Sequence, residues 1–140
     1  MVPGPERGDD PLAPRQPIST RVHGVLDYAT AGLLLTAPRA LGWGSRTRRL
    51  LATAGIGATA YSLLTEYELG AVRKLPMPVH LNLDAASGLR LLLAAATRLR
   101  GEPAAGRWGT AVIGAFEVLA ATVTRPPVGP VRLVRTSARA

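Results

Sequence analysis

The chain carries one short pattern twice, a histidine followed four residues later by an aspartate, near the start of two apolar stretches. His23 and Asp27 form the first pair, and His80 and Asp84 form the second pair 57 positions later. The chain has no other histidine. Because residues four apart on an α-helix lie on the same face, each pair would project from one side of a helix. The pattern predicts two copies of one helical unit.

A second pair of segments supports this duplication. Residues 53–58 read Thr-Ala-Gly-Ile-Gly-Ala and residues 110–115 read Thr-Ala-Val-Ile-Gly-Ala, again 57 positions apart. A shared offset predicts a duplicated helix-loop-helix unit. Small residues spaced four apart let two helix backbones approach closely. We therefore expect helix packing at four such pairs: Thr53/Gly57, Ala54/Ala58, Thr110/Gly114 and Ala111/Ala115.

The apolar segments predict an all-α fold, a bundle of four helices built from two tandem hairpins. Proline, glycine and arginine separate the segments, as expected at helix ends. The expected helices span about residues 20–37, 49–67, 79–99 and 108–124. They give a domain over residues 18–124, with repeats at about 20–70 and 77–124, a disordered proline-rich tail at 1–17 and a basic tail at 125–140.

The length and composition of the helices favour a membrane over a water-soluble bundle. Residues 50–64 carry no charge, and residues 49–67 have about the length that crosses a bilayer, near 20 residues. Helices that are apolar all round are either buried in protein or in contact with lipid. A chain of 140 residues has no room to bury four of them. We expect four transmembrane helices, with the two hairpins entering from the same side as a parallel repeat.

The distribution of charge is also typical of membrane helices. The net charge is +8, but the basic residues lie mainly between the apolar segments and in the tails. A nucleic-acid surface would need a basic face with interleaved aromatic residues, so nucleic acid is not an expected partner. The basic loops slightly favour both termini on the cytoplasmic side. The expected partners are the lipid bilayer and, through the small-residue faces, a second copy or another membrane protein.

Counting residues outward from the two hairpin loops predicts a polar cluster near one membrane face. With loop centres near residues 44 and 103, His23 falls level with Thr65, and Asp84 falls level with Thr122. The expected cluster comprises His23, Asp27, Thr65, Glu66, His80, Asp84 and Thr122. It is either a structural network that satisfies polar groups out of reach of water, or a site for a metal or for proton transfer. Two histidines and two carboxylates, His23, His80, Asp27 and Asp84, would suit zinc or iron.

The same count places Arg90 and Glu117 at one depth, near the middle of the second hairpin. A lone charge in the middle of a bilayer is costly. A mutual ion pair between the two side chains is therefore predicted.

Several motifs resemble the SPW-repeat family of membrane proteins, over about residues 22–124. They are His-x-x-Leu-Asp in both halves, Gly32-Leu33 and Gly88-Leu89, residues 61–70 (Tyr-Ser-Leu-Leu-Thr-Glu-Tyr-Glu-Leu-Gly) and residues 76–81 (Pro-Met-Pro-Val-His-Leu). The family's Ser-Pro-Trp step is Ala37-Pro38-Arg39 in the first half and Ala96-Thr97-Arg98 in the second. The resemblance implies a bacterial four-helix protein of the cytoplasmic membrane whose biochemical role is unestablished.

The sequence favours a structural or accessory role over catalysis. No phosphate-binding loop, nucleophile elbow or metalloprotease helix is present, and without cysteine there is no thiolate metal site or disulfide. On this interpretation the histidines need no cofactor. The alternative is a proton-handling, ion-handling or metal-binding membrane protein that uses the paired His-xxx-Asp cluster.

Overall fold

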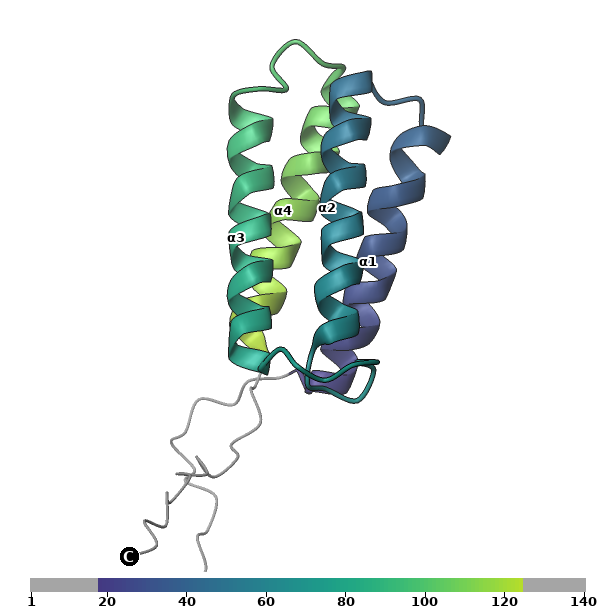
Figure 1. The fold of residues 1–140 in the computed structure, drawn as a ribbon. Coiled ribbons are helices and arrows are strands. Elements are labelled where there is room, and N and C mark those ends of the chain that lie inside the picture. The colour runs from purple at the N-terminus through teal and green to yellow at the C-terminus, as the bar shows by residue number, and fades with distance from the viewer. Residues whose placement is uncertain (1–17, 125–140) are drawn as a thin grey trace, which may run out of the picture.

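The computed structural model describes residues 18–124, and the predicted tails at 1–17 and 125–140 lie outside this part. The prediction of an all-α, four-helix architecture is confirmed (Figure 1). The helices follow one another along the chain as α1 (Thr20–Ala40), α2 (Ser45–Leu64), α3 (Met77–Ala96) and α4 (Ala104–Val123).

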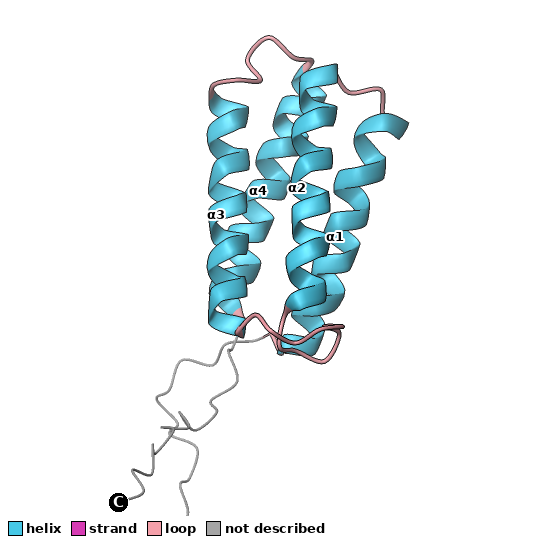
Figure 2. Ribbon diagram, viewed as in Figure 1, coloured by secondary structure: helices cyan, strands magenta, loops and turns pink. Residues whose placement is uncertain are grey.

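The helices form two antiparallel hairpins that stand side by side (Figure 2). The α1–α2 and α3–α4 connections lie at one end of the bundle (Figure 1). The long α2–α3 connection, residues 65–76, lies at the other end, together with the start of α1 and the end of α4. Both His-xxx-Asp pairs stand in the first two turns of α1 and α3, so the topology brings them to this same end.

The helix ends follow local signals in the sequence, with a shift in register. The Ser19 side chain caps α1 by accepting a hydrogen bond from the Val22 N–H at 3.3 Å, as its residue type favours. Pro78 occupies the first turn of α3, where a missing N–H costs nothing. Helix α1 continues through Pro38 to Ala40, and α2 and α4 each begin four residues before the predicted starts. Both hairpin loops are therefore centred earlier than expected.

Small residues hold the two helices of each hairpin close together. A Cβ atom added at Gly88 would lie 2.5 Å from the Gly114 carbonyl oxygen, and one added at Gly55 would lie 3.1 Å from that of Ala31. The predicted packing pairs Thr110/Gly114 and Ala54/Ala58 are buried, whereas Thr53 and Gly57 are exposed and Ala111/Ala115 is only partly covered. The expectation is right for two of the four pairs.

The two hairpins have the same structure, but the sequence offset between equivalent residues is different for the first and the second helix of the hairpin. The starts of α1 and α3 keep the offset of 57 positions. Helices α2 and α4 correspond at 59 positions, as shown by their bounds and by matching buried positions such as Gly55 with Gly114 and Thr65 with Thr124. The identity between residues 53–58 and 110–115 therefore does not mark equivalent positions.

The interior contains two apolar groups at different levels. Leu34, Leu51 and Leu91 are fully buried towards the end with the short loops, and Met77 and Tyr67 are buried near the long loop. Within residues 18–124, none of the helices combines the length and the apolar character needed to cross a membrane.

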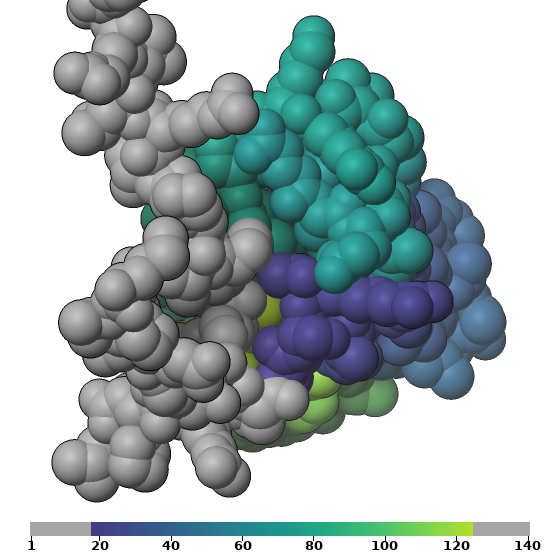
Figure 3. Space-filling model, turned by 90° about the horizontal axis from the view of Figure 1, so that it is seen from below, coloured from purple at the N-terminus to yellow at the C-terminus, as the bar shows by residue number. Residues whose placement is uncertain are grey.

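The long loop closes the lower end of the bundle. Figure 3 shows residues 65–76, in teal, lying against the start of α1, in purple. The Thr20 hydroxyl donates to the Glu68 carboxylate at 3.0 Å, and the Tyr67 ring lies directly against Gly24. This contact explains why position 24 is a glycine, since any side chain there would displace the ring.

Candidate metal centre

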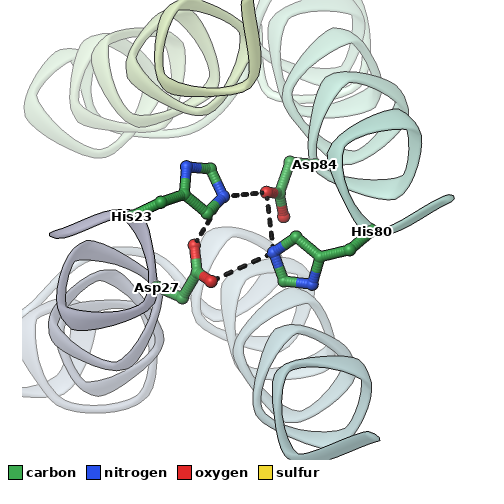
Figure 4. Close-up of side chains that lie close together, drawn as sticks. All are labelled: His23, Asp27, His80 and Asp84. Atoms are coloured by element: carbon green, nitrogen blue, oxygen red, sulfur yellow. Dashed lines mark hydrogen bonds and ion pairs between the residues drawn. The ribbon is translucent and has the colours of Figure 1, made fainter. Parts of the chain in front are cut away.

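Two histidines and two aspartates from different hairpins meet inside the bundle (Figure 4). His23 and Asp27 project from α1, and His80 and Asp84 project from α3, each pair from a single helix face as its spacing predicts. Each residue offers one ligand atom, and all four atoms lie within 4.8 Å of one another. Within residues 18–124 they are the one group of three or more metal-ligand side chains that lie this close.

Both histidines present the same ring nitrogen, Nε2, to the two carboxylates. His23 Nε2 lies 2.8 Å from Asp84 Oδ2 and 3.2 Å from Asp27 Oδ1. His80 Nε2 lies 3.1 Å from Asp84 Oδ2 and 3.0 Å from Asp27 Oδ2. Each nitrogen thus contacts a carboxylate of its own helix and one of the opposite hairpin.

The cluster is shielded from solvent. Both histidines are 0% exposed and Asp84 is 5% exposed. The two imidazole rings meet edge to face, with centroids 5.3 Å apart. Charged groups in such a place must be paired with opposite charge or bound to a cation.

The other ring nitrogen of each histidine is held by a threonine of the opposite hairpin. His23 Nδ1 lies 2.7 Å from the Thr124 hydroxyl, and His80 Nδ1 lies 2.8 Å from the Thr65 hydroxyl. Each threonine is the residue that follows the last turn of its helix, α4 or α2. The two hairpins therefore exchange equivalent contacts.

These threonines determine which ring nitrogen carries a proton. Each hydroxyl already donates its single hydrogen to the carbonyl four residues earlier, Thr124 to Ala120 and Thr65 to Tyr61, both at 2.7 Å. A hydroxyl that has given its hydrogen can only accept from the histidine. Nδ1 must therefore be the N–H donor on both rings, and a neutral ring directs its Nε2 lone pair at the carboxylates.

A lone pair facing a carboxylate is repulsive, so something positive must lie between them. Either both rings carry a second proton at Nε2, or a cation occupies the space. The geometry at His80 favours a cation: within the described chain its Nε2 is buried and makes no well-aligned hydrogen bond, although both carboxylates are close. Histidines that bind metals are held in this way, with the second nitrogen donating to a protein acceptor.

Two tyrosine hydroxyls donate hydrogen bonds to the two aspartates. The Tyr61 hydroxyl donates to Asp84 Oδ1 at 2.6 Å, which leaves Oδ2 to the two imidazoles. The Tyr67 hydroxyl makes a longer contact with Asp27 Oδ2, at 3.4 Å. Burial raises the pKa of the Tyr67 phenol above its usual range, so it stays protonated and able to donate.

The donor set suits a divalent transition metal. Two carboxylates carry two negative charges. One divalent ion, with both imidazoles neutral, balances them as two imidazolium rings would. Two nitrogens and two oxygens form a tetrahedral zinc site when the ligand atoms stand about 3.3 Å apart, given bonds of about 2.0–2.1 Å. The nitrogen–oxygen distances of 2.8 to 3.2 Å would widen by a few tenths of an ångström, and the remaining ligand-atom distances, which are all within 4.8 Å, would adjust around the ion.

The structure brings together most, but not all, of the predicted polar cluster. His23, Asp27, His80, Asp84 and Thr65 meet as expected. Glu66 is exposed on the loop, and Thr122 is exposed and bonds only to the carbonyl of Leu119. Their inclusion was wrong, because the loop centres assumed in the depth count lie too late in the chain.

Three residues that contact the cluster were not predicted from the sequence. Thr124 is the equivalent of Thr65 at the offset of 59 positions, which the identity of residues 53–58 with 110–115 concealed. Tyr61 lies one turn before Thr65 on the same helix face, a spacing that could have revealed it. Tyr67 reaches the cluster through a loop whose path the sequence does not specify.

The predicted ion pair between Arg90 and Glu117 does not form. Arg90 is exposed, Glu117 is only 7% exposed, and no ion pair within 4.0 Å joins them. The α3–α4 loop is centred near residue 100 rather than 103, so Glu117 stands close to the level of Asp84, and Arg90 stands nearer the other end of the bundle. Glu117 instead lines a small cavity shared with Asp27 and Asp84.

Comparisons of the chain with known protein families, with curated proteins and with solved structures find no match. The resemblance to SPW-repeat proteins remains a prediction from the motifs.

Proposed function

We propose that the protein binds one divalent transition metal ion, zinc being the best fit, through His23, Asp27, His80 and Asp84. The ion would join the two hairpins, since each hairpin supplies one histidine and one aspartate. Its role would be to fix the hairpins against each other at the end of the bundle closed by the long loop.

The observation that carries this proposal is the orientation of the two imidazoles. Thr124 and Thr65 accept from Nδ1 on both rings, which directs both Nε2 atoms towards two carboxylates in a buried space. This is the arrangement of a histidine metal ligand held by a hydrogen bond on its far side. The buried Nε2 of His80, without a well-aligned partner in the described chain, supports a cation at this position.

A structural network without metal is the competing function. Both rings would then be imidazolium ions paired with the aspartates, and the cluster would serve only to satisfy polar groups inside the bundle. The short contact between His23 and Asp84, 2.8 Å, favours this alternative because it has the length of a charge-assisted hydrogen bond.

Metal analysis of the purified protein separates the two. Wild type, Asp84→Asn and the double variant His23→Gln with His80→Gln are purified in detergent, incubated with zinc and freed of excess ion. Glu68→Gln is the matched control, since it removes a carboxylate from the exposed loop. We expect one zinc per chain in wild type and in the control, and less than a tenth as much in the cluster variants, because losing a ligand should cost at least the roughly 10- to 100-fold in affinity that follows loss of a residue supporting a ligand.

The same measurement can contradict the proposal. If wild type folds, as judged by its helical circular dichroism, and holds no more zinc than the double histidine variant, the cluster is not a metal site. The imidazolium network would then be the function of these residues.

We also propose a membrane setting for this site, as the sequence predicts. Its support is an inverted distribution of side chains: the outward positions Leu33, Ile56, Leu93 and Val112, one on each helix, are each more than half exposed. Polar side chains such as His23, His80 and Thr110 are fully buried. Lipid is the solvent that favours polar groups inside and apolar groups outside.

The exposed charges of the helices are placed consistently with this setting. Arg21, Arg39 and Arg48 lie close to helix ends, and Arg90 is the exception. In length alone, helices of 20 or 21 residues, about 30 Å, match the thickness of a bilayer's hydrocarbon core. Extraction of cell membranes with alkaline carbonate tests it: we expect the protein to stay with the membranes, and release into the supernatant would contradict the setting.

A further inference from the structure

Glu117 is a buried acid that neither the metal ligands nor their supporting hydrogen bonds account for. It stands on α4, is only 7% exposed, and its Oε2 has no hydrogen-bond partner within the described chain. A buried carboxylate oxygen left without a partner is costly. A bound molecule that donates a hydrogen bond to this oxygen would remove that cost.

Glu117 faces a small cavity that touches the candidate metal centre. All four helices line the cavity, and its lining residues are Leu26, Asp27, Thr30, Ala58, Tyr61, Asp84, Phe116, Glu117 and Ala120. Its volume is about 20 Å³, enough for one water molecule, which needs about 10–15 Å³ measured in this way. A buried water also needs two to four polar partners, and the Asp27, Asp84 and Glu117 side chains provide them.

The cavity exists because the two repeats differ at this level. At the offset of 59 positions, Glu117 corresponds to Ala58 and Ala120 corresponds to Tyr61. Tyr61 fills the space beside Asp84 and donates to it. The small Ala120 leaves the equivalent space empty of side chain, and the Glu117 carboxyl group borders it. The second repeat thus has an alanine in place of the tyrosine, which leaves a cavity, and a glutamate in place of an alanine.

We propose that this cavity is the position of a single water-sized ligand bound to the metal, with Glu117 as its hydrogen-bond acceptor. The inference rests on the proposed metal site and deepens it. The four protein ligands come from α1 and α3, and two of them, Asp27 and Asp84, line the cavity together with residues of α2 and α4. A water or hydroxide there becomes a fifth ligand, as zinc sites with an accessible position allow.

Cobalt provides the test, because Co²⁺ takes the same ligands as zinc and is visible to spectroscopy. The full chain is purified in detergent, loaded with Co²⁺ and placed in water enriched in oxygen-17. We expect oxygen-17 to broaden or split the cobalt electron paramagnetic resonance signal of wild type. Cobalt that binds to wild type without any oxygen-17 effect would overturn the inference while leaving the metal site intact.

Fluoride then tests the role of Glu117, since it is the size of water but cannot donate a hydrogen bond. The Glu117 carboxylate should repel fluoride, and the near-isosteric Glu117→Gln should bind it roughly tenfold or more tightly, judged by the cobalt absorption bands. Glu66→Gln removes a comparable charge from the exposed loop and should bind fluoride as wild type does. Equal fluoride affinity in both variants would overturn the role of Glu117.

Failure of the metal site itself gives a different result. If wild type binds no cobalt, both the metal site and the bound water are wrong. If cobalt binds and is lost on His80→Gln, but neither oxygen-17 nor Glu117→Gln has any effect, only the inference about the cavity is wrong. The wild-type oxygen-17 measurement needs no substitution, so it decides the question even where a variant does not fold.

Discussion

Replacing Thr65 by valine tests whether the threonines orient the histidines for metal binding. Valine has nearly the shape of threonine but lacks the hydroxyl that lies 2.8 Å from His80 Nδ1 in a fully buried position. The Nδ1–H group would lose its acceptor where water cannot replace it, at a cost of about 1–3 kcal/mol. The neutral ring would also be free to move its proton to Nε2, the nitrogen that the metal needs.

The size of the expected effect on metal affinity follows from this change. Loss of a hydrogen bond behind a metal-binding histidine weakens affinity about 10- to 100-fold, which corresponds to about 1.4–2.7 kcal/mol. That range agrees with the cost of the buried N–H group, so one cause explains both effects. Zinc affinity is measured in detergent by competition with a coloured chelator of known affinity.

Two matched variants make the result interpretable. Thr65→Ser keeps the hydroxyl and should bind zinc within about threefold of wild type. Thr122→Val makes the same chemical change on the exposed face of α4, where the hydroxyl bonds only to its own helix, and should have no effect. If Thr65→Val binds zinc as tightly as Thr122→Val does, the threonine does not orient a metal ligand and the reasoning fails.

Three further predictions follow from other parts of the bundle. Tyr61→Phe removes the 2.6 Å hydrogen bond to Asp84 and should lower the free energy of unfolding by about 1–3 kcal/mol, measured by denaturant titration in detergent; an unchanged midpoint would contradict the contact. Gly88→Ala places a methyl group against the α4 backbone and should destabilise the bundle by at least about 1 kcal/mol, whereas Gly57→Ala, at an open position, should be neutral or stabilising by up to about 1 kcal/mol; similar melting of the two variants would refute the close approach. Arg90→Leu should leave the melting temperature within about 2 °C of wild type because this exposed side chain has no acidic partner within 4.0 Å in the described chain, and a large drop would restore the ion pair predicted from the sequence.

The sequence predicted the four-helix architecture well because its strongest signals are local and repeated. Four apolar segments separated by proline, glycine and arginine were enough to predict four helices. The His-xxx-Asp spacing placed each pair on one helix face, and the duplication required both faces to meet at one end of the bundle. These conclusions depend on helix periodicity and chain direction, which the order of residues determines.

The depth of each residue within the bundle was harder to predict because it is counted from the loop centre, so any error in the helix ends shifts it. The α3–α4 loop is centred about three residues before its predicted position. Since depth is counted away from the loop on both helices, the partner of any residue moves by twice that amount. Arg90 was therefore matched with Glu117, which instead stands beside the cavity next to Asp84.

The support of the site was the least predictable part. Thr65 was expected level with His23 of its own hairpin, but Thr65 and Thr124 each bind the histidine of the opposite hairpin, a contact that no spacing along one helix encodes. Tyr67 comes from a loop whose fold depends on its packing against Gly24. Such contacts depend on tertiary packing, which a single sequence leaves open.

Zinc K-edge X-ray absorption of the zinc-loaded protein is the most direct measurement of the central claim. We expect one zinc ion with four or five nitrogen or oxygen ligands at about 2.0–2.2 Å, and outer-shell scattering from two imidazole rings. His23→Gln and His80→Gln should each remove one ring from that scattering. A zinc ion surrounded by water oxygens alone, or a spectrum without imidazole scattering, would contradict a metal centre built from the paired histidines.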